Sequence, residues 1–127
     1  MRMVRLGVCS ILAGSVLLAA GCKPNLRIPH MGVKRITATP KVGVHVRVEN
    51  AGHRHAAKPF KVLFRNHATG ATATVPFAHG LKRHQSRPIR AQLPAAAGEM
   101  IVVRVDPDDH VDESDENDNT RKKPAPP

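Results

Sequence analysis

Aromatic side chains are nearly absent from this chain of 127 residues. It contains no Trp, no Tyr and only three Phe, so aromatic residues make up 2% of the sequence. Modules that hold sugars or single-stranded nucleic acid stack their ligands on exposed aromatic rings, and the composition argues against both. Apolar residues (41%) and charged residues (24%) lie in the range of a globular protein, and the length fits one domain.

Long hydrophobic runs are also lacking. The longest extends from Leu6 to Ala20, behind Arg2 and Arg5, and is shorter than the roughly 20 residues that a spanning helix needs. A positive start followed by a short apolar run is typical of a secretory signal peptide. The run ends in Leu18-Ala19-Ala20-Gly21-Cys22, which resembles the lipobox of bacterial lipoproteins. This resemblance implies a signal peptide over residues 1–21 and lipidation at Cys22.

Cysteine is scarce in a way that fits lipidation. Only Cys9 and Cys22 are present, and Cys9 would leave with the signal peptide. A mature chain with one Cys forms no internal disulfide, and without a lipid Cys22 would be an exposed thiol. We therefore expect Cys22 to anchor the protein to a membrane of the cell envelope through a tether of residues 22–25. Lys23 after the lipidated position favours the outer membrane, with the domain periplasmic or surface-facing.

The remaining chain is patterned as strands. Residues 42–48 alternate strictly between apolar and polar, which indicates a half-buried strand. Similar runs cover 60–64, 71–77, 88–93 and 99–105, whereas the run over 26–39 is interrupted by Pro29 and Gly32. Pro76 suggests that its strand lies at an edge or is ending. No segment shows a helical period, and short strands about ten residues apart favour an antiparallel β-sandwich.

Several motifs resemble the CARDB domain, the cell-adhesion-related domain of bacteria. Residues 105–120 are similar to its closing pattern V-D-x-x-N-x-V-x-E-S-D-E-x-N-N, with Asp118 where Asn is usual. Residues 24–26, 46–52 and 60–62 resemble its opening P-D-L, its V-x-V-x-N-x-G turn and its F-x-V strand. The resemblance implies an all-β fold, a single immunoglobulin-like or fibronectin-like antiparallel β-sandwich over residues 26–120. It also implies a non-catalytic module of surface and secreted proteins.

The C-terminus departs from the family pattern. The family's last strand continues past the Asn pair with alternating Thr and Val, but here Thr120 is followed by a segment with no apolar face. We therefore expect residues 121–127 to be a basic, Pro-rich, disordered tail and the last strand to be stunted. Its neighbour's edge would then be partly unpaired, and such an edge can accept a strand from another chain.

Charge is segregated along the chain. Residues 22–105 hold fifteen Lys or Arg and two acids, whereas residues 106–119 hold eight acids and no Lys or Arg. A strongly basic body attracts phosphate-rich polymers. The alternative interpretation is that these Lys and Arg side chains form an ordinary solvated surface. No motif that reads nucleic acid is present, so we expect no specific nucleic-acid binding. The partner would be an envelope protein or an anionic envelope polymer.

The acidic segment has three interpretations. It is a solvated turn, or a turn tied by side-chain bonds to backbone amides with Val111 tucked inward, or a Ca²⁺ site. The spacing does not match an EF-hand, because no Gly occupies the sharp-turn position. We favour the turn without metal. The candidate calcium ligands are Asp106, Asp108, Asp112, Glu113, Asp115 and Glu116.

Catalytic and transition-metal chemistry have little support. Ser86 lies near His84 without an acid to orient the imidazole, and no Gly-rich phosphate cradle follows a strand. Four histidines, at positions 53, 55, 79 and 84, fall in two turns and are more typical of solvated loops. We expect no enzyme activity. The sequence favours a lipid-anchored binding, adhesion or structural module of the envelope, with a polyanion-binding protein as the alternative.

Overall fold

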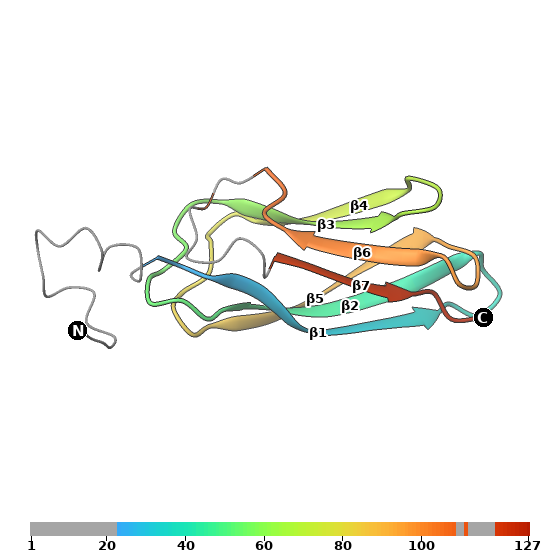
Figure 1. The fold of residues 1–127 in the computed structure, drawn as a ribbon, viewed down its shortest axis with the longest axis horizontal. Helices are drawn as coiled ribbons and strands as arrows, with labels where there is room; N and C mark the ends of the chain where they lie inside the picture. The colour runs from blue at the N-terminus through green and yellow to red at the C-terminus, as the bar shows by residue number, and fades with distance from the viewer. Residues whose placement is uncertain (1–22, 109–110, 112–118) are drawn as a thin grey trace, which may run out of the picture.

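The computed structural model describes residues 23–108, 111 and 119–127. Within them, two antiparallel sheets pack face to face as a sandwich, drawn in Figure 1. One sheet has the strand order β1-β2-β5 and the other β4-β3-β6-β7. This confirms the expected all-β, fibronectin-like sandwich. The strands are β1 (Leu26–Arg35), β2 (Lys41–Asn50), β3 (Phe60–Asn66), β4 (Thr72–Phe77), β5 (Ser86–Pro94), β6 (Met100–Val105) and β7 (Thr120–Pro124).

The core lies between the sheets and consists of the inward-facing alternate residues of the strands. In β2, Val42, Val44, Val46 and Val48 are all at most 2% exposed, which confirms the alternation read from the sequence. Burying an aliphatic or aromatic side chain of this size contributes roughly 1.5–3 kcal/mol. Strands β3 and β6 supply the opposite wall with Phe60, Val62, Phe64, Ile101, Val103 and Val105.

Strand β1 continues through the two residues that were expected to interrupt it. The β1–β2 register shifts between Arg27 and His30, so Pro29, which has no amide hydrogen to donate, lies in the irregularity. Gly32 lies under the imidazole of His45, where a Cβ atom would approach the ring to 2.2 Å. Any larger residue at this position would have to displace the His45 ring.

Residues 23–25, expected to be part of the tether, are bound to the domain. The amide of His53 donates to the carbonyl of Lys23 at 3.3 Å, and the amide of Ala51 donates to that of Asn25 at 2.8 Å. Gly52 makes this approach possible, because a Cβ atom there would lie 2.4 Å from the Lys23 oxygen. The folded domain therefore includes residues 23–25.

Strand β7 corrects the prediction of a disordered 121–127 tail and an unpaired neighbouring edge. Thr120–Pro124 pairs with Met100–Arg104 of β6 over five consecutive residues. All five β7 residues are exposed, so the strand forms through main-chain hydrogen bonds and needs no apolar face. The sequence pattern missed it because alternation reports only strands that bury one side.

Further bonds hold the C-terminal segment in place. The amide of Ala125 donates to the carbonyl of Glu99 at 2.8 Å, and the Ala125 side chain is buried. Arg35 donates to the carbonyl of Pro126 at 2.9 Å. The segment after β7 is thus part of the domain as well.

Candidate functional site: the outer face of the three-stranded sheet

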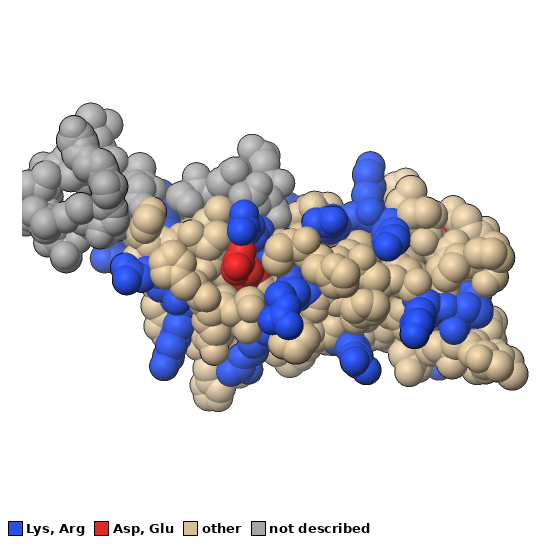
Figure 2. Space-filling model, turned by 90° about the horizontal axis from the view of Figure 1, so that it is seen from below, with Lys and Arg blue, Asp and Glu red and all other residues tan. Residues whose placement is uncertain are grey.

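The outer face of the β1-β2-β5 sheet is strongly basic. Outward positions follow from the register, since residues that pair across antiparallel strands share a face. Figure 2 shows the molecule from below the view of Figure 1, which is the side of β1 and β2. Basic side chains extend along the whole length of this side, with one small acidic patch among them. The ionisable residues of this outer face are Arg27, His30, Lys34, Lys41, His45, Arg47, Glu49 and Arg90.

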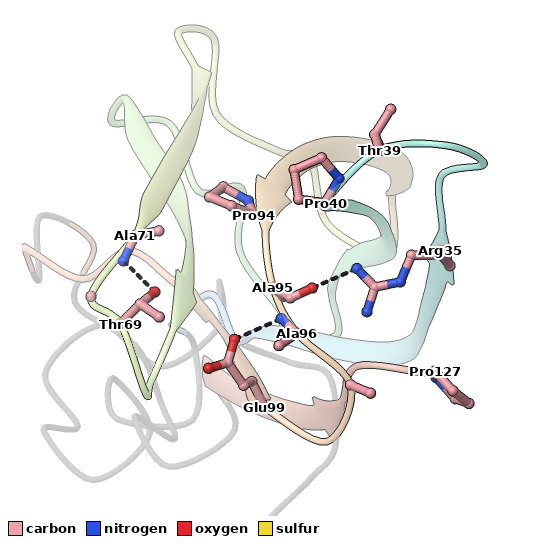
Figure 3. A pocket seen from close by; sticks show the side chains of 12 residues that line it. Arg35, Thr39, Pro40, Thr69, Ala71, Pro94, Ala95, Ala96, Glu99 and Pro127 are labelled. Carbon is pink, nitrogen blue, oxygen red and sulfur yellow. Dashed lines mark hydrogen bonds between the residues drawn. The ribbon is translucent and has the colours of Figure 1, made fainter.

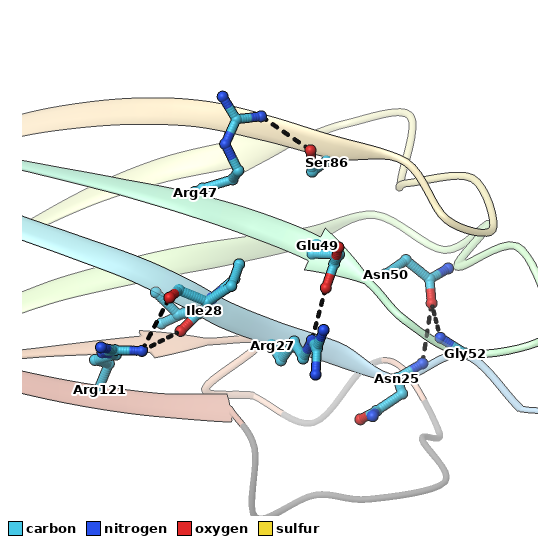
Figure 4. Close-up of polar contacts among 10 residues, drawn as sticks. Asn25, Arg27, Ile28, Arg47, Glu49, Asn50, Gly52, Ser86 and Arg121 are labelled. Carbon is cyan, nitrogen blue, oxygen red and sulfur yellow. Dashed lines mark hydrogen bonds and ion pairs between the residues drawn. The ribbon is translucent and has the colours of Figure 1, made fainter.

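The one acid of this set is already paired. The Arg27 Nε donates to Glu49 Oε1 at 2.6 Å, and Arg47 donates to the Ser86 hydroxyl at 2.9 Å, as drawn in Figure 4. An ion pair this exposed adds little stability, because water and salt screen it. It does cancel the Glu49 charge, so the rest of the face remains positive.

A hollow of about 370 Å³ lies on this face above Gly43. Gly43 pairs with Lys34 of β1 on one side and with Gln92 of β5 on the other, while His45, two residues further along β2, pairs with Arg90. All four of these side chains line the hollow. Because glycine has no side chain, the hollow is a gap in an otherwise basic surface.

A second hollow, of about 900 Å³, lies at the end of the sandwich and is shown in Figure 3. Its lining is rich in Pro and Ala, and its two charged residues are used by the fold. Arg35 donates to the carbonyl of Ala95. Glu99 accepts hydrogen bonds from the amide of Ala96 at 2.7 Å and from Asn66 Nδ2 at 3.0 Å. These bonds, the one from Ala96 foremost, lower the pKa of Glu99 below its usual 4.5.

The described part of the acidic segment supports a turn held by backbone bonds. Asp106 is 3% exposed, and its Oδ2 accepts a hydrogen bond from the amide of Val111 at 2.8 Å. Val111 is also buried, as predicted. The Asp108 carboxylate pairs with Lys61 Nζ at 2.9 Å. Asp106 and Asp108 are thus bound by groups of the protein itself.

The other candidate calcium ligands, Asp112, Glu113, Asp115 and Glu116, lie outside the described residues. Residues 23–108, 111 and 119–127 contain no group of three or more His, Cys, Asp or Glu side chains placed to hold a metal ion. The bridge between Ala56 and Leu81 does bring the two histidine-containing turns together. The turn without metal remains the favoured prediction, with calcium binding as its alternative.

The predicted signal peptide and Cys22 also lie outside the described residues. In the part of the chain that the structure does describe, no helix is long and apolar enough to cross a membrane. The hollow above Gly43 was not found from the sequence, which assigned the positive charge to the whole body. The sequence did contain a signal for it. The outward positions of residues 41–49 are Lys, Gly, His, Arg and Glu, so one residue without a side chain lies among charged and polar ones.

The fold and this surface define a class: a small antiparallel β-sandwich module with basic outer sheet faces, since the other sheet also presents Lys61, Arg65, Arg104 and Lys122. The chain belongs to the CARDB family, whose model matches residues 23–123. CARDB is a family of non-catalytic domains.

Two solved structures share the fold, both of a CARDB domain from Pyrococcus furiosus. The crystal structure, in complex with di-metal ions, is 20% identical with a TM-score of 0.61 and covers 82% of this chain and 88% of that one. The solution NMR structure is 19% identical with a TM-score of 0.64, and the match covers 82% of this chain and 94% of that one. The comparison with curated proteins finds no match.

Proposed function

We propose that this protein is a lipid-anchored, non-catalytic binding module of the bacterial cell envelope. The observation that carries the proposal is the position of the lipobox-like segment, which ends at Cys22, directly before Lys23, whose carbonyl accepts a hydrogen bond from the domain. Acyl chains on Cys22 would therefore hold one end of the sandwich at a membrane with little slack. Several chains are needed for firm anchoring, because each buried methylene contributes only about 0.8 kcal/mol.

Replacing the lipidated residue tests the anchor. Cys22→Ser expressed in a bacterial host should remain unprocessed and carry no acyl groups, since only a thiol forms the thioether. Intact-protein mass spectrometry of the membrane fraction measures both properties. Cys9→Ser is the matched control and should be processed and lipidated like the parent. An acylated Cys22→Ser protein would refute the anchor.

Binding through a sheet edge has little support from the fold. Each of the four edge strands contains proline, which has no amide hydrogen to donate to an added strand. Natural sheets use edge prolines to prevent pairing with other chains. The residues are Pro29 in β1, Pro76 in β4, Pro88 and Pro94 in β5, and Pro124 in β7.

The basic sheet face favours a second, more specific function, the binding of an anionic polymer of the envelope. Its single carboxylate is paired with Arg27, so the face presents a net positive surface. Electrostatic binding of this kind weakens steeply with salt, whereas strand addition does not. Isothermal titration calorimetry of the protein with a polyphosphate, at several salt concentrations, distinguishes the two. Affinity independent of salt would contradict binding by the basic face.

A further inference from the structure

The backbone at Gly43 leaves room that residues 23–108, 111 and 119–127 do not fill. Gly43 does not have the positive φ that would require glycine. A Cβ atom built there would meet nothing nearer than Ile36 Cγ1, at 4.0 Å. Glycine weakens a strand interior, and an isolated one often marks a place where a ligand approaches the backbone. Neither the backbone conformation nor the packing at this position explains why it is occupied by glycine.

The polar side chains around the gap are hydrogen-bond donors, and those of Lys34, Lys41 and Arg90 carry positive charge. Lys34 and Gln92 flank Gly43 directly, at the strand spacing of about 4.8 Å. His45 and Lys41 lie two residues away along β2, at about 7 Å, and Arg90 is beside His45. Within the part of the chain that the structure describes, Lys34, Lys41 and Arg90 form no ion pair. No carboxylate lines the hollow.

We propose that the hollow above Gly43 binds a phosphate group of an anionic polymer. The proposal rests on the polyanion-binding function and assigns it a site. The Arg90 guanidinium presents a planar fork of donors that fits two phosphate oxygens, and Lys34 adds a point charge from the opposite side. The Gln92 amide and the His45 ring add further N–H donors. The missing side chain at Gly43 gives the phosphate space between them.

The position of the hollow favours a polymer over the phospholipids of the anchoring leaflet. The chain enters the domain beside Asn50, at one end of β2, and Gly43 lies seven residues away along that strand. At about 3.4 Å per residue this separation is about 24 Å. Where β2 stands away from the leaflet that holds Cys22, this separation exceeds the Debye length of about 8 Å at physiological salt, and leaflet charge would be largely screened at the hollow.

The test uses the mature lipidated protein in phosphatidylcholine vesicles, titrated with sodium tripolyphosphate by calorimetry. Gly43→Val places a branched side chain on the floor of the hollow without changing charge, and valine suits an open strand position, so the variant should fold and bind at least tenfold more weakly. Arg90→Gln should weaken binding about tenfold, as expected for the loss of a charged donor. Arg104→Gln is the matched control, because it removes one exposed positive charge from the other sheet, and it should change affinity less than twofold.

Each result decides the proposal. If Gly43→Val is folded, by its circular dichroism spectrum and melting curve, and binds like the parent, the site is wrong. If Arg104→Gln weakens binding as much as Arg90→Gln, the net charge of the protein determines the affinity. The proposed site above Gly43 is then wrong, but the proposed polyanion binding still holds. If the parent protein does not bind tripolyphosphate, both the site above Gly43 and the polyanion-binding function are wrong. The lipidation of Cys22 is tested separately and does not depend on this result. Vesicles that also contain phosphatidylglycerol should leave the affinity unchanged, and competition by them would assign the hollow to leaflet headgroups instead.

Discussion

Asn50 is the residue on which one end of the sandwich depends. It is fully buried, and its side chain makes four hydrogen bonds, two of which are drawn in Figure 4. The Oδ1 accepts from the amides of Asn25 and Gly52, each at 3.0 Å. The Nδ2 donates to the carbonyls of Arg54 at 2.8 Å and Leu81 at 3.1 Å. The Asn of the family's V-x-V-x-N-x-G pattern thus has a structural role here.

Asn50→Ala should destabilise the domain by about 2–4 kcal/mol, because it leaves several buried backbone groups without partners. Thermal or urea unfolding measures the loss. His53→Ala, an exposed neighbour in the same turn, is the control and should melt within a degree or two of the parent. Equal stability of the two variants would show that Asn50 is not essential to this end.

Glu99 makes stability depend on pH at the other end of the sandwich. Its pKa is lowered by the hydrogen bonds from Ala96 and Asn66 and by the nearby Arg35. A carboxyl whose pKa is lower in the folded state stabilises the fold above its unfolded value of about 4.5, and that stabilisation is lost as pH falls through the folded pKa. Glu99→Gln should therefore be less stable than the parent at pH 7, and the difference should shrink below pH 4. Urea unfolding across this range measures it, and a constant difference would refute the linkage.

At the scale of elements, β7 shows how a strand without an apolar face is retained. Its backbone pairs with β6, and Arg121 joins it to the opposite sheet by donating to the carbonyls of Ile28 and Pro29, both at 3.1 Å. Figure 4 shows this contact between β7 and β1. The side chain of one basic residue thus connects the two edge strands on this side of the sandwich.

Arg121→Ala should lower the free energy of unfolding by about 1 kcal/mol, a charged hydrogen-bond contribution reduced by its exposure. In a domain of this size the melting temperature would fall by roughly 4–8 °C. Lys122→Ala also removes an exposed positive charge from β7 and, lacking a bond to β1, should melt close to the parent. Similar losses in both variants would indicate a general charge effect.

At the scale of the whole molecule, positive charge lies on the outer faces of both sheets and negative charge lies in the acidic segment. Asp108 is paired with Lys61, and Asp106 is bound to the amide of Val111. Millimolar Ca²⁺ should therefore raise the melting temperature by no more than a degree or two, and Mg²⁺ should behave alike. Differential scanning calorimetry measures the shift. A Ca²⁺-specific rise of about ten degrees that disappears in Asp112→Asn would establish a cation site, since ligand at a hundredfold excess over Kd adds about 2.7 kcal/mol.

The sequence by itself determined the sandwich and most of its strands, because a strand with one buried face carries a period of two in its own residues. Val42 to Val48 is the clearest example, and the inward position of Val111 was likewise apparent. Only the tertiary structure decided that β7 pairs with β6 and that residues 23–25 are bound to the domain. The pairing of β7 uses main-chain groups that every residue shares, apart from proline's missing amide hydrogen, so no side-chain pattern reports it. Residues 23–25 are held by the amides of the 51–53 turn and by the Asn50 side chain, which meet them only when the chain folds. The hollow above Gly43 is decided by register, since Lys34, Gly43 and Gln92 are distant in the chain and meet only when three strands align.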